Sequence, residues 1–171
     1  RFVGQIASHV GQGLPGERIH YVIEEEPLGV AHALNLARPY NENARLMIYF
    51  SDNITTIEFG ELVAEFTIAK TPPGCLLIAR EESHPEAFGV AVMNDEEKIC
   101  DIVEKPANPP SNLAIGGIYL FDERFWDFLD TATAQQGDAF SISDITRVYV
   151  KQGEAEVVSV GEETWGDCGT P

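Results

Sequence analysis

The chain has 171 residues, of which 44% are hydrophobic and 23% are charged, a composition typical of a globular protein. Its 28 acidic residues outnumber its 11 basic residues, which gives a formal net charge of −17. This charge argues against nucleic acid polymers and anionic membranes as partners. It also predicts that a phosphorylated ligand needs a cation or a few well-placed basic side chains beside it.

Hydrophobic periodicity divides the chain into short strands and helices. The 46–50 block is entirely apolar, which predicts a strand buried on both faces. Gly116 and Gly117 lie inside another strand, which indicates a bulge or a close backbone approach. In chain order, we expect strands at 18–23, 46–50, 75–79, 114–121 and 155–160, the last of the chain, and a hairpin of 88–93 and 98–103. We expect helices at 29–37 and 59–66, and two more capped by Asp122 and Ser141. The first helix should stop at Arg38-Pro39, because a residue before proline avoids helical geometry, and Thr55 to Glu58 fits a capping box for the second.

No repeat, low-complexity tract or interdomain linker interrupts this pattern, so it predicts a single mixed α/β domain with a largely buried sheet. No apolar run approaches the roughly 18 residues of a membrane-spanning helix, and the N-terminus lacks the pattern of a signal peptide. Cys75, Cys100 and Cys168 are widely spaced and form no CxxC pair. They indicate free thiols in a reducing compartment, so we expect the cytoplasm.

Two aspartates are candidate ligands of Mg²⁺. Asp52 follows the predicted strand 46–50, where open α/β sheets bind ligands, and a carboxylate is a hard oxygen ligand that suits this ion. Asp167 lies in the C-terminal motif WGDCGT, where Trp165 and the glycines indicate a shaped loop that could lie beside Asp52. Both residues also have simpler interpretations, since Asp52 can cap a turn and Trp165 can fix a C-terminal turn.

Three further motifs leave alternatives open. Lys105, at the end of a predicted strand, is either a point charge for a phosphate or part of an exposed charged pair. Gly29 opens a helix and would let a flat ligand approach its backbone, although the preceding glutamates favour the same helix start without a ligand. Residues 11–16 spell GxGxxG, but a strand-like segment follows where a dinucleotide site needs a helix, which favours a simple turn.

Seven short motifs occur in an order typical of one enzyme family, and together they span nearly the whole chain from about residue 20. They are 24–33 (EEEPLGVAHA), 50–53 (FSDN), 88–90 (FGV), 104–106 (EKP), 111–119 (SNLAIGGIY), 141–147 (SISDITR) and 165–170 (WGDCGT). In these motifs the chain resembles the sugar-1-phosphate nucleotidyltransferases, in particular the glucose-1-phosphate thymidylyltransferase and uridylyltransferase group. The resemblance implies a Rossmann-like nucleotide-diphospho-sugar transferase fold with a mixed, mostly parallel sheet flanked by helices. It also implies that residues 1–171 are one nucleotidyltransferase domain, incomplete at both ends.

The resemblance further implies an enzyme that joins a nucleoside triphosphate and a sugar-1-phosphate into an NDP-sugar and pyrophosphate, with glucose-1-phosphate and dTTP or UTP as substrates. Asp52 and Asp167 would then hold Mg²⁺ on the triphosphate, and Lys105 would bind the sugar phosphate. The remaining implied substrate-binding residues are Glu104 and Gly89 at the sugar, Glu24, Pro27 and Gly29 at the base, and Asn112 and Gly117 in the SNLAIGGIY motif. We expect no membrane or nucleic acid partner, and a homo-oligomer is one possible assembly.

The chain departs from the family pattern at two places. Members that use thymidine or uridine triphosphates commonly carry a glutamine where this chain has Glu24. A carboxylate only accepts hydrogen bonds and suits guanine better, so an activity like that of mannose-1-phosphate guanylyltransferases stays open. The family's N-terminal glycine-rich loop, with its triphosphate-binding arginine and lysine, is not found in the chain. This leaves open a non-catalytic relative that binds sugar nucleotides.

Overall fold

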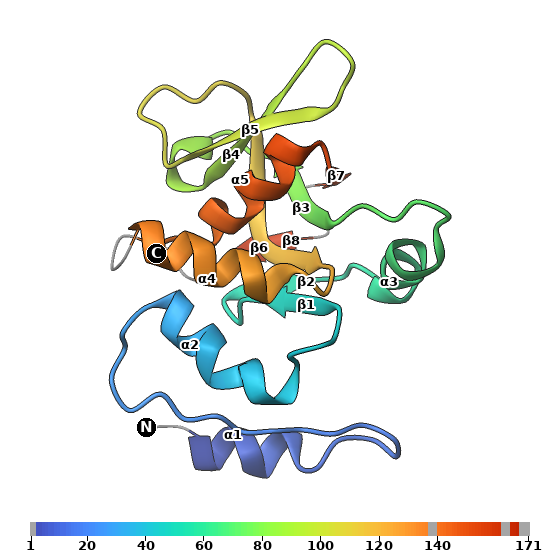
Figure 1. The fold of residues 1–171 in the computed structure, drawn as a ribbon, viewed down its shortest axis with the longest axis vertical. Coiled ribbons are helices and arrows are strands. Elements are labelled where there is room, and N and C mark those ends of the chain that lie inside the picture. The colour runs from blue at the N-terminus through green and yellow to red at the C-terminus, as the bar shows by residue number, and fades with distance from the viewer. Residues whose placement is uncertain (1–2, 137–139, 162–164, 168–171) are drawn as a thin grey trace.

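The computed structural model describes residues 3–136, 140–161 and 165–167, and Figure 1 shows their arrangement. A six-stranded mixed sheet forms the centre, in the order β5-β4-β6-β3-β7, and β1 pairs with β6 beside this path. A separate two-stranded sheet joins β2 to β8. The strands are β1 (Leu46–Tyr49), β2 (Asn53–Thr55), β3 (Cys75–Glu81), β4 (Gly89–Met93), β5 (Ile99–Glu104), β6 (Leu113–Phe121), β7 (Ala155–Val160) and β8 (Trp165–Asp167).

Strand β6 has a fork along one edge. Its other edge is paired with β3. On the forked edge, Ala114 and Ile115 pair with β4, whereas residues 118–121 pair with β1. Gly116 and Gly117 lie between these two partners, where no described strand pairs with this edge and the Gly117 carbonyl accepts the Phe50 N–H at 2.8 Å. The predicted close approach at this glycine pair is confirmed, since a Cβ on Gly116 would lie 2.6 Å from the Trp165 ring.

The expected mixed sheet is confirmed, but its parallel character is smaller than expected. Strands β1, β3, β4 and β7 point one way, and β5 and β6 point the other way. Each strand that pairs with β6 is antiparallel to it. The pair of β3 and β7 is therefore the one parallel pair among the described strands. The hairpin of β4 and β5 adds a further antiparallel pair, as its turn at residues 94–97 predicted.

Helices cover the two faces of the sheet unequally. Alternate residues of β3 and β6, such as Leu77 and Phe121, pack against α4 (Phe125–Gln136) and α5 (Ile142–Gln152) to form the main core. Leu76 and Leu120 point to the other face, where they pack with Phe66 of α3 (Phe59–Ile68) in a small cluster. Burying a Leu or Phe side chain in this way stabilises a fold by about 1.5–3 kcal/mol. The period of two in the strands therefore separates the two cores.

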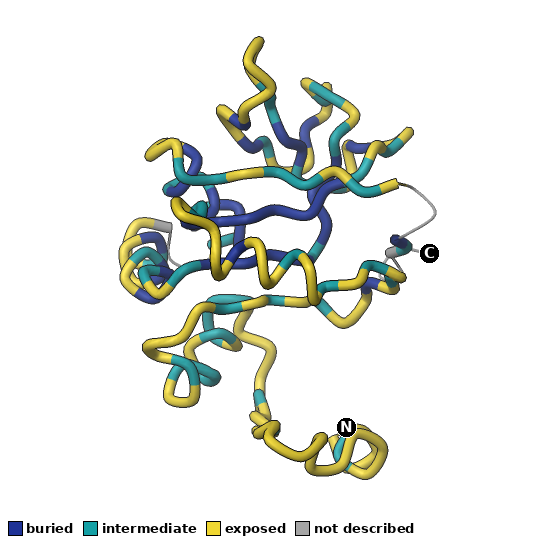
Figure 2. Tube along the Cα trace, turned by 90° about the vertical axis from the view of Figure 1, so that its right-hand side faces the viewer, coloured by how far each residue is buried: buried dark blue, intermediate teal, exposed yellow. Residues whose placement is uncertain are grey.

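The N-terminal segment lies apart from this core. Figure 2 shows its chain as largely exposed, and helix α1 (Val3–Val10) has no buried residue. The strand expected at 18–23 is wrong: these residues form neither a helix nor a strand. A strand is stable when a neighbour satisfies its backbone groups, and no described strand lies alongside this segment. Residues 11–16 form an exposed turn, with no strand before it and no helix directly after it.

Helix α2 (Val30–Ala37) ends where Arg38-Pro39 predicted, but Arg38 itself keeps helical angles (φ −51°, ψ −45°). The chain tightens there into a 3-10 turn (Arg38–Tyr40), whose first positions tolerate proline. The predicted burial of β1 on both faces is wrong, because its residues alternate and Met47 and Tyr49 are 38% and 39% exposed. The Tyr49 ring on the more exposed face meets Phe59, the first residue of α3, edge-on with ring centroids 5.9 Å apart, so this face is only partly covered.

Two local predictions also need correction. The capping box at Thr55 is wrong: helix α3 begins after Glu58, and the Thr55 hydroxyl accepts the Ile57 N–H at 3.1 Å. The strand at 155–160 is present but is not the last, since β8 follows it. By contrast, α5 begins after Ser141, whose N–H donates to Asp144 at 2.8 Å, and ends at Gly153 in the left-handed region (φ 71°). None of the described helices has both the length and the apolar character needed to cross a membrane.

Candidate active site

A pocket opens at the fork of β6. It is built from the residues after β1, the turn before β4, the end of β5, the middle of β6, the start of α5, and Trp165 of β8. Its cavity volume is about 230 Å³ and it opens to solvent, which leaves room for a small ligand or part of one. Five residues of the sequence-predicted site line it, namely Asp52, Gly89, Glu104, Lys105 and Gly117. Segments from Phe50 to Trp165, 115 residues apart along the chain, thus meet where the two sides of the fork separate at the glycine pair.

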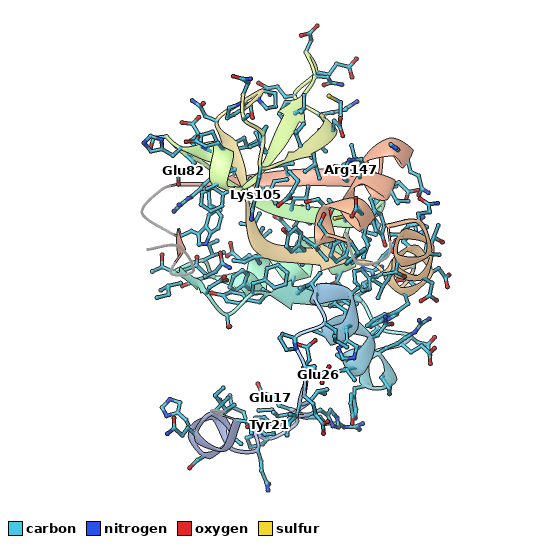
Figure 3. The ribbon with its side chains drawn as sticks, turned by 90° about the vertical axis from the view of Figure 1, so that its left-hand side faces the viewer. Glu17, Tyr21, Glu26, Glu82, Lys105 and Arg147 are labelled. Carbon is cyan, nitrogen blue, oxygen red and sulfur yellow. The ribbon has the colours of Figure 1, made fainter. Side chains whose placement is uncertain are left out.

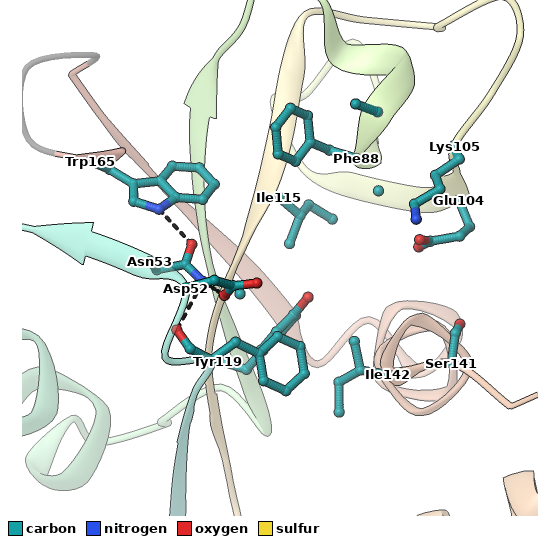
Figure 4. A pocket seen from close by; sticks show the side chains of 14 residues that line it. Asp52, Asn53, Phe88, Glu104, Lys105, Ile115, Tyr119, Ser141, Ile142 and Trp165 are labelled. Atoms are coloured by element: carbon teal, nitrogen blue, oxygen red, sulfur yellow. Dashed lines mark hydrogen bonds between the residues drawn. The ribbon is translucent and has the colours of Figure 1, made fainter. Parts of the chain in front are cut away.

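Asp52 stands on one wall of this pocket (Figure 4). It is solvent-exposed, whereas the next residue, Asn53, is 7% exposed. The Asn53 amide nitrogen donates to Asp52 Oδ1 at 2.8 Å and to the Phe50 carbonyl at 3.0 Å. Its amide oxygen accepts the Trp165 indole N–H at 2.6 Å. These bonds connect the end of β1 to β8 directly beneath Asp52.

The backbone of Asp167 lies next to this corner. In the antiparallel pair of β2 and β8, Asp167 stands opposite Asn53, the residue that follows Asp52. Arg80 of β3 fixes β8 from the other side, because its Nη1 donates to the Trp165 carbonyl at 2.5 Å and its guanidinium lies 4.5 Å from the Trp165 ring centroid. Residues 168–170 of the WGDCGT motif, which include Cys168, lie outside the described residues.

Glu104 and Lys105 form the opposite wall (Figure 4). Glu104 Oε2 accepts a hydrogen bond from the Ser143 hydroxyl of α5 at 2.7 Å. A Cβ on Gly89 would lie 3.2 Å from the same oxygen, so glycine leaves the carboxylate uncrowded. Lys105 has a φ of 43°, in the left-handed region that side chains rarely adopt, and its N–H donates to the Phe88 carbonyl at 2.9 Å. Such strain is concentrated at functional sites.

Tyr119 lines the base of the pocket from β6. Burial raises the pKa of its phenol well above the ordinary value, and the nearby Glu104 carboxylate raises it further. The hydroxyl therefore stays protonated at neutral pH and can donate a hydrogen bond. The walls together present carboxylates on two sides, a single lysine and neutral hydroxyls. This donor and acceptor set suits a polyhydroxy ligand that carries a phosphate.

Comparison with known proteins identifies the family to which this architecture belongs. A family model described as nucleotidyl transferase matches residues 4–171. The chain belongs to the nucleotidyl transferase family. Its fold matches that of a Bacillus anthracis protein described as a glucose-1-phosphate thymidylyltransferase and solved with sucrose, with a TM-score of 0.85 and 31% identity over 98% of this chain and 67% of that one. The expected Rossmann-like nucleotidyltransferase fold is thereby confirmed.

Two curated relatives align with nearly the whole nucleotidyl transferase chain. It is 30% identical over 168 residues to the low-salt glycan biosynthesis nucleotidyltransferase of Haloferax volcanii, and 28% identical over 166 residues to a glucose-1-phosphate thymidylyltransferase of Streptomyces griseus. These alignments cover 98% and 96% of this chain but 46% of each relative. The chain thus spans about half the length of the curated relatives that it matches.

Four residues of the predicted substrate-binding set lie outside the pocket of this nucleotidyl transferase chain. Glu24, Pro27 and Gly29 lie at the start of α2, and Asn112 is exposed in the loop before β6. Gly29 precedes α2 with a φ of 98°, which favours glycine.

The Glu24 carboxylate is already engaged at this helix start. Its Oε1 lies 2.9 Å from His32 Nδ1 and accepts the Leu28 N–H at 3.3 Å. These contacts agree with the helix-start interpretation of Glu24.

The donor set of the nucleotidyl transferase pocket fits the expected Mg²⁺. This ion takes one or two protein carboxylates and completes its shell with water and substrate phosphates. Asp52 Oδ2 has no hydrogen-bond partner among the described residues. The described part of the chain holds no group of three or more residues that could together bind a metal ion. An ion bound at Asp52 would therefore need further ligands, such as substrate phosphates. The fit is to an ion that arrives with a phosphorylated substrate.

Sequence reasoning missed Asn53 and Tyr119, which line the pocket, and Ser143, which donates a hydrogen bond to the pocket residue Glu104. Asn53 follows Asp52 directly, and its amide can both donate and accept hydrogen bonds. That property was the one sign in the sequence that it could hold a neighbouring carboxylate. Tyr119 is the last residue of the SNLAIGGIY motif, but its sequence context is that of an ordinary core aromatic residue. Ser143 lies 39 residues from Glu104, so their hydrogen bond exists only through the packing of α5 on β5.

Proposed function

We propose that the protein containing this chain is a sugar-1-phosphate nucleotidyltransferase that forms an NDP-sugar and pyrophosphate. An oxygen of the sugar phosphate attacks the α-phosphorus of a nucleoside triphosphate, and pyrophosphate leaves with the electrons of the broken P–O bond. Positioning and charge neutralisation carry this chemistry without a covalent enzyme intermediate. The observation that supports it most is the meeting of Asp52, Glu104 and Lys105 around one pocket in a chain of this family.

Each wall would have a distinct task. Lys105 would bind the sugar phosphate as a point charge, and Glu104 would accept hydrogen bonds from sugar hydroxyls while Ser143 occupies its Oε2. Gly89 would offer backbone contacts to the sugar beside Glu104. Asp52 and Asp167 would hold Mg²⁺, which withdraws charge from the triphosphate. The free thiols Cys75 and Cys100 favour a reducing compartment, so we propose a cytoplasmic enzyme.

We further propose glucose-1-phosphate with dTTP or UTP as the substrates. Relatives named glucose-1-phosphate thymidylyltransferases support this choice. The contacts of Glu24 with His32 and Leu28 favour it over the guanine alternative, because one carboxylate oxygen is already occupied at the helix start.

The test is pyrophosphate release by the full-length protein with Mg²⁺, each of the four common nucleoside triphosphates, and glucose-1-phosphate or mannose-1-phosphate. We expect the highest rate with glucose-1-phosphate and dTTP or UTP. Release with GTP and mannose-1-phosphate would instead establish the guanylyltransferase alternative. If no combination released pyrophosphate while calorimetry detected binding of an NDP-sugar, the protein would be a non-catalytic relative.

A further inference from the structure

Asn53 is a buried polar residue whose side chain is fully engaged beneath the pocket. It is 7% exposed, and its amide makes three hydrogen bonds of 2.6–3.0 Å. The Tyr49 hydroxyl also donates to its backbone carbonyl at 2.8 Å. Leaving such buried groups without partners would be costly, so the network specifies one arrangement.

The partners of this amide determine which way it faces. The Trp165 indole N–H can only donate, so it must meet the amide oxygen. The Phe50 carbonyl and a carboxylate such as that of Asp52 are acceptors, so they must meet the amide nitrogen. A carboxylate could not donate, an aliphatic side chain could do neither, and a hydroxyl has one O–H and could donate to only one of the two acceptors. Asparagine is therefore the short side chain that can join Trp165 to Asp52.

Close packing also prevents the amide from moving. A Cβ on Gly117 would lie 2.5 Å from Asn53 Nδ2 and 2.8 Å from the Phe50 ring, so the amide lies directly on the glycine backbone. Trp165 is 4% exposed and covers Gly116 in the same way. Asp52, in contrast, is exposed, and Asn53 is the one described side chain that forms a hydrogen bond with it.

We propose that Trp165 and Asn53 are positioning residues that hold the Asp52 carboxylate in one orientation, with Oδ1 occupied and Oδ2 presented to a divalent cation in the pocket. The inference rests on the proposed function, in which Asp52 is a ligand of Mg²⁺. Because Trp165 belongs to β8, the same contact couples the position of Asp52 to the strand whose backbone carries Asp167. Outer partners that orient a metal-binding carboxylate typically change metal affinity by about 10- to 100-fold when removed.

The test measures Mn²⁺ binding to the full-length protein by electron paramagnetic resonance, with Mn²⁺ alone and with pyrophosphate. Asn53→Ala removes the whole amide, whereas Trp165→Phe removes the indole N–H together with part of the ring that covers Gly116. Trp126→Phe is the matched control: Trp126 is 3% exposed and donates one indole hydrogen bond, to the Asn41 carbonyl at 3.1 Å, away from the pocket. Asp52→Asn tests the underlying metal assignment. Thermal melts confirm that each variant folds.

We expect Asn53→Ala to weaken Mn²⁺ binding by about 10- to 100-fold and Trp165→Phe to weaken it less, with no change in Trp126→Phe. The Mg²⁺ concentration for half-maximal activity of Asn53→Ala should rise, while its KM for the sugar phosphate stays unchanged because Glu104 and Lys105 lie on the other wall. If one of the two variants does not fold, the other decides.

Wild-type Mn²⁺ affinity in Asn53→Ala and Trp165→Phe, with the affinity lost in Asp52→Asn, would overturn this inference and leave the proposed function standing. Equal weakening in Trp126→Phe would also overturn it, since a general loss of stability would then explain the result. Unchanged Mn²⁺ binding in Asp52→Asn would remove the metal role of Asp52 and the inference together.

Discussion

The backbone of Lys105 offers a test of whether this pocket stores strain for its function. Lys105 has a φ of 43°, and an L-residue in the left-handed region costs about 1–2 kcal/mol. Glycine avoids that cost but loses about 0.5–1 kcal/mol of backbone entropy relative to alanine. Lys105→Gly should therefore be about 0.5–1 kcal/mol more stable than Lys105→Ala, which keeps the strain and also lacks the charge.

For a chain of this size, 1 kcal/mol corresponds to about 2–4 °C in Tm, which differential scanning calorimetry resolves. Both variants should lose affinity for the sugar phosphate, because both lack the ammonium group. Glu97 is the matched control, since it has a φ of 59° in an exposed turn outside the pocket. Glu97→Gly should exceed Glu97→Ala in Tm by a similar amount, without a change in activity. If Lys105→Ala were as stable as Lys105→Gly while the Glu97 pair differed as expected, the strain at Lys105 would be refuted.

Four further outcomes follow from the site and the charge distribution. Asp52→Ala should abolish Mg²⁺-dependent pyrophosphate release and lower Tm by about 2–4 °C, because the buried Asn53 amide loses its Asp52 acceptor, and unchanged turnover would remove the metal assignment of Asp52. Gly117→Ala should destabilise the fold by about 1–3 kcal/mol in urea unfolding, since its Cβ would lie 2.5 Å from Asn53 Nδ2; a wild-type midpoint would contradict this packing. Added NaCl should raise Tm by screening repulsion among the 28 acidic residues, and a flat salt response would show that this repulsion is small. Burial alone would raise the pKa of Glu82, but hydrogen bonds from the His84 and Ser83 N–H groups and the charge of Arg80 outweigh burial and lower it. Glu82 therefore stabilises the fold fully above its unfolded pKa, and this contribution is lost as pH falls through the lower folded value. Glu82→Gln should flatten the acid side of the stability profile between these two pKa values, and an unchanged profile would refute the shift.

Local patterns in the sequence were sufficient for several elements. The run 75–79 is uninterrupted and apolar, and β3 is buried there. The turn at 94–97 predicted the β4 and β5 hairpin, because both strands are neighbours along the chain. Ser141 and Gly153 marked the two ends of α5, since capping depends on residues within one turn of the helix. These features are determined by interactions between residues that are close in sequence.

The prediction failed where a distant partner decides the outcome. Residues 18–23 have a strand-like composition but pair with none of the described strands, so they form no strand. The apolar residues of β1 alternate because Leu46 and Ile48 pack on the main core, whereas the other face is only partly covered, by the contact of Tyr49 with Phe59 of α3. Similarly, the antiparallel placement of β6 between β1 and β3 cannot be read from its own residues.

The order of residues along this nucleotidyl transferase chain is enough to predict which residue types reach its pocket. They are Asp52, Glu104 and Lys105 at strand ends, and glycines where the backbone must approach closely. The tertiary structure decided how they meet. It opened the edge of β6 at the glycine pair, placed Ser143 on Glu104, and joined Trp165 to Asp52 through Asn53. These contacts link residues as many as 112 positions apart, so they depend on strand order and helix packing and leave no local pattern in the chain.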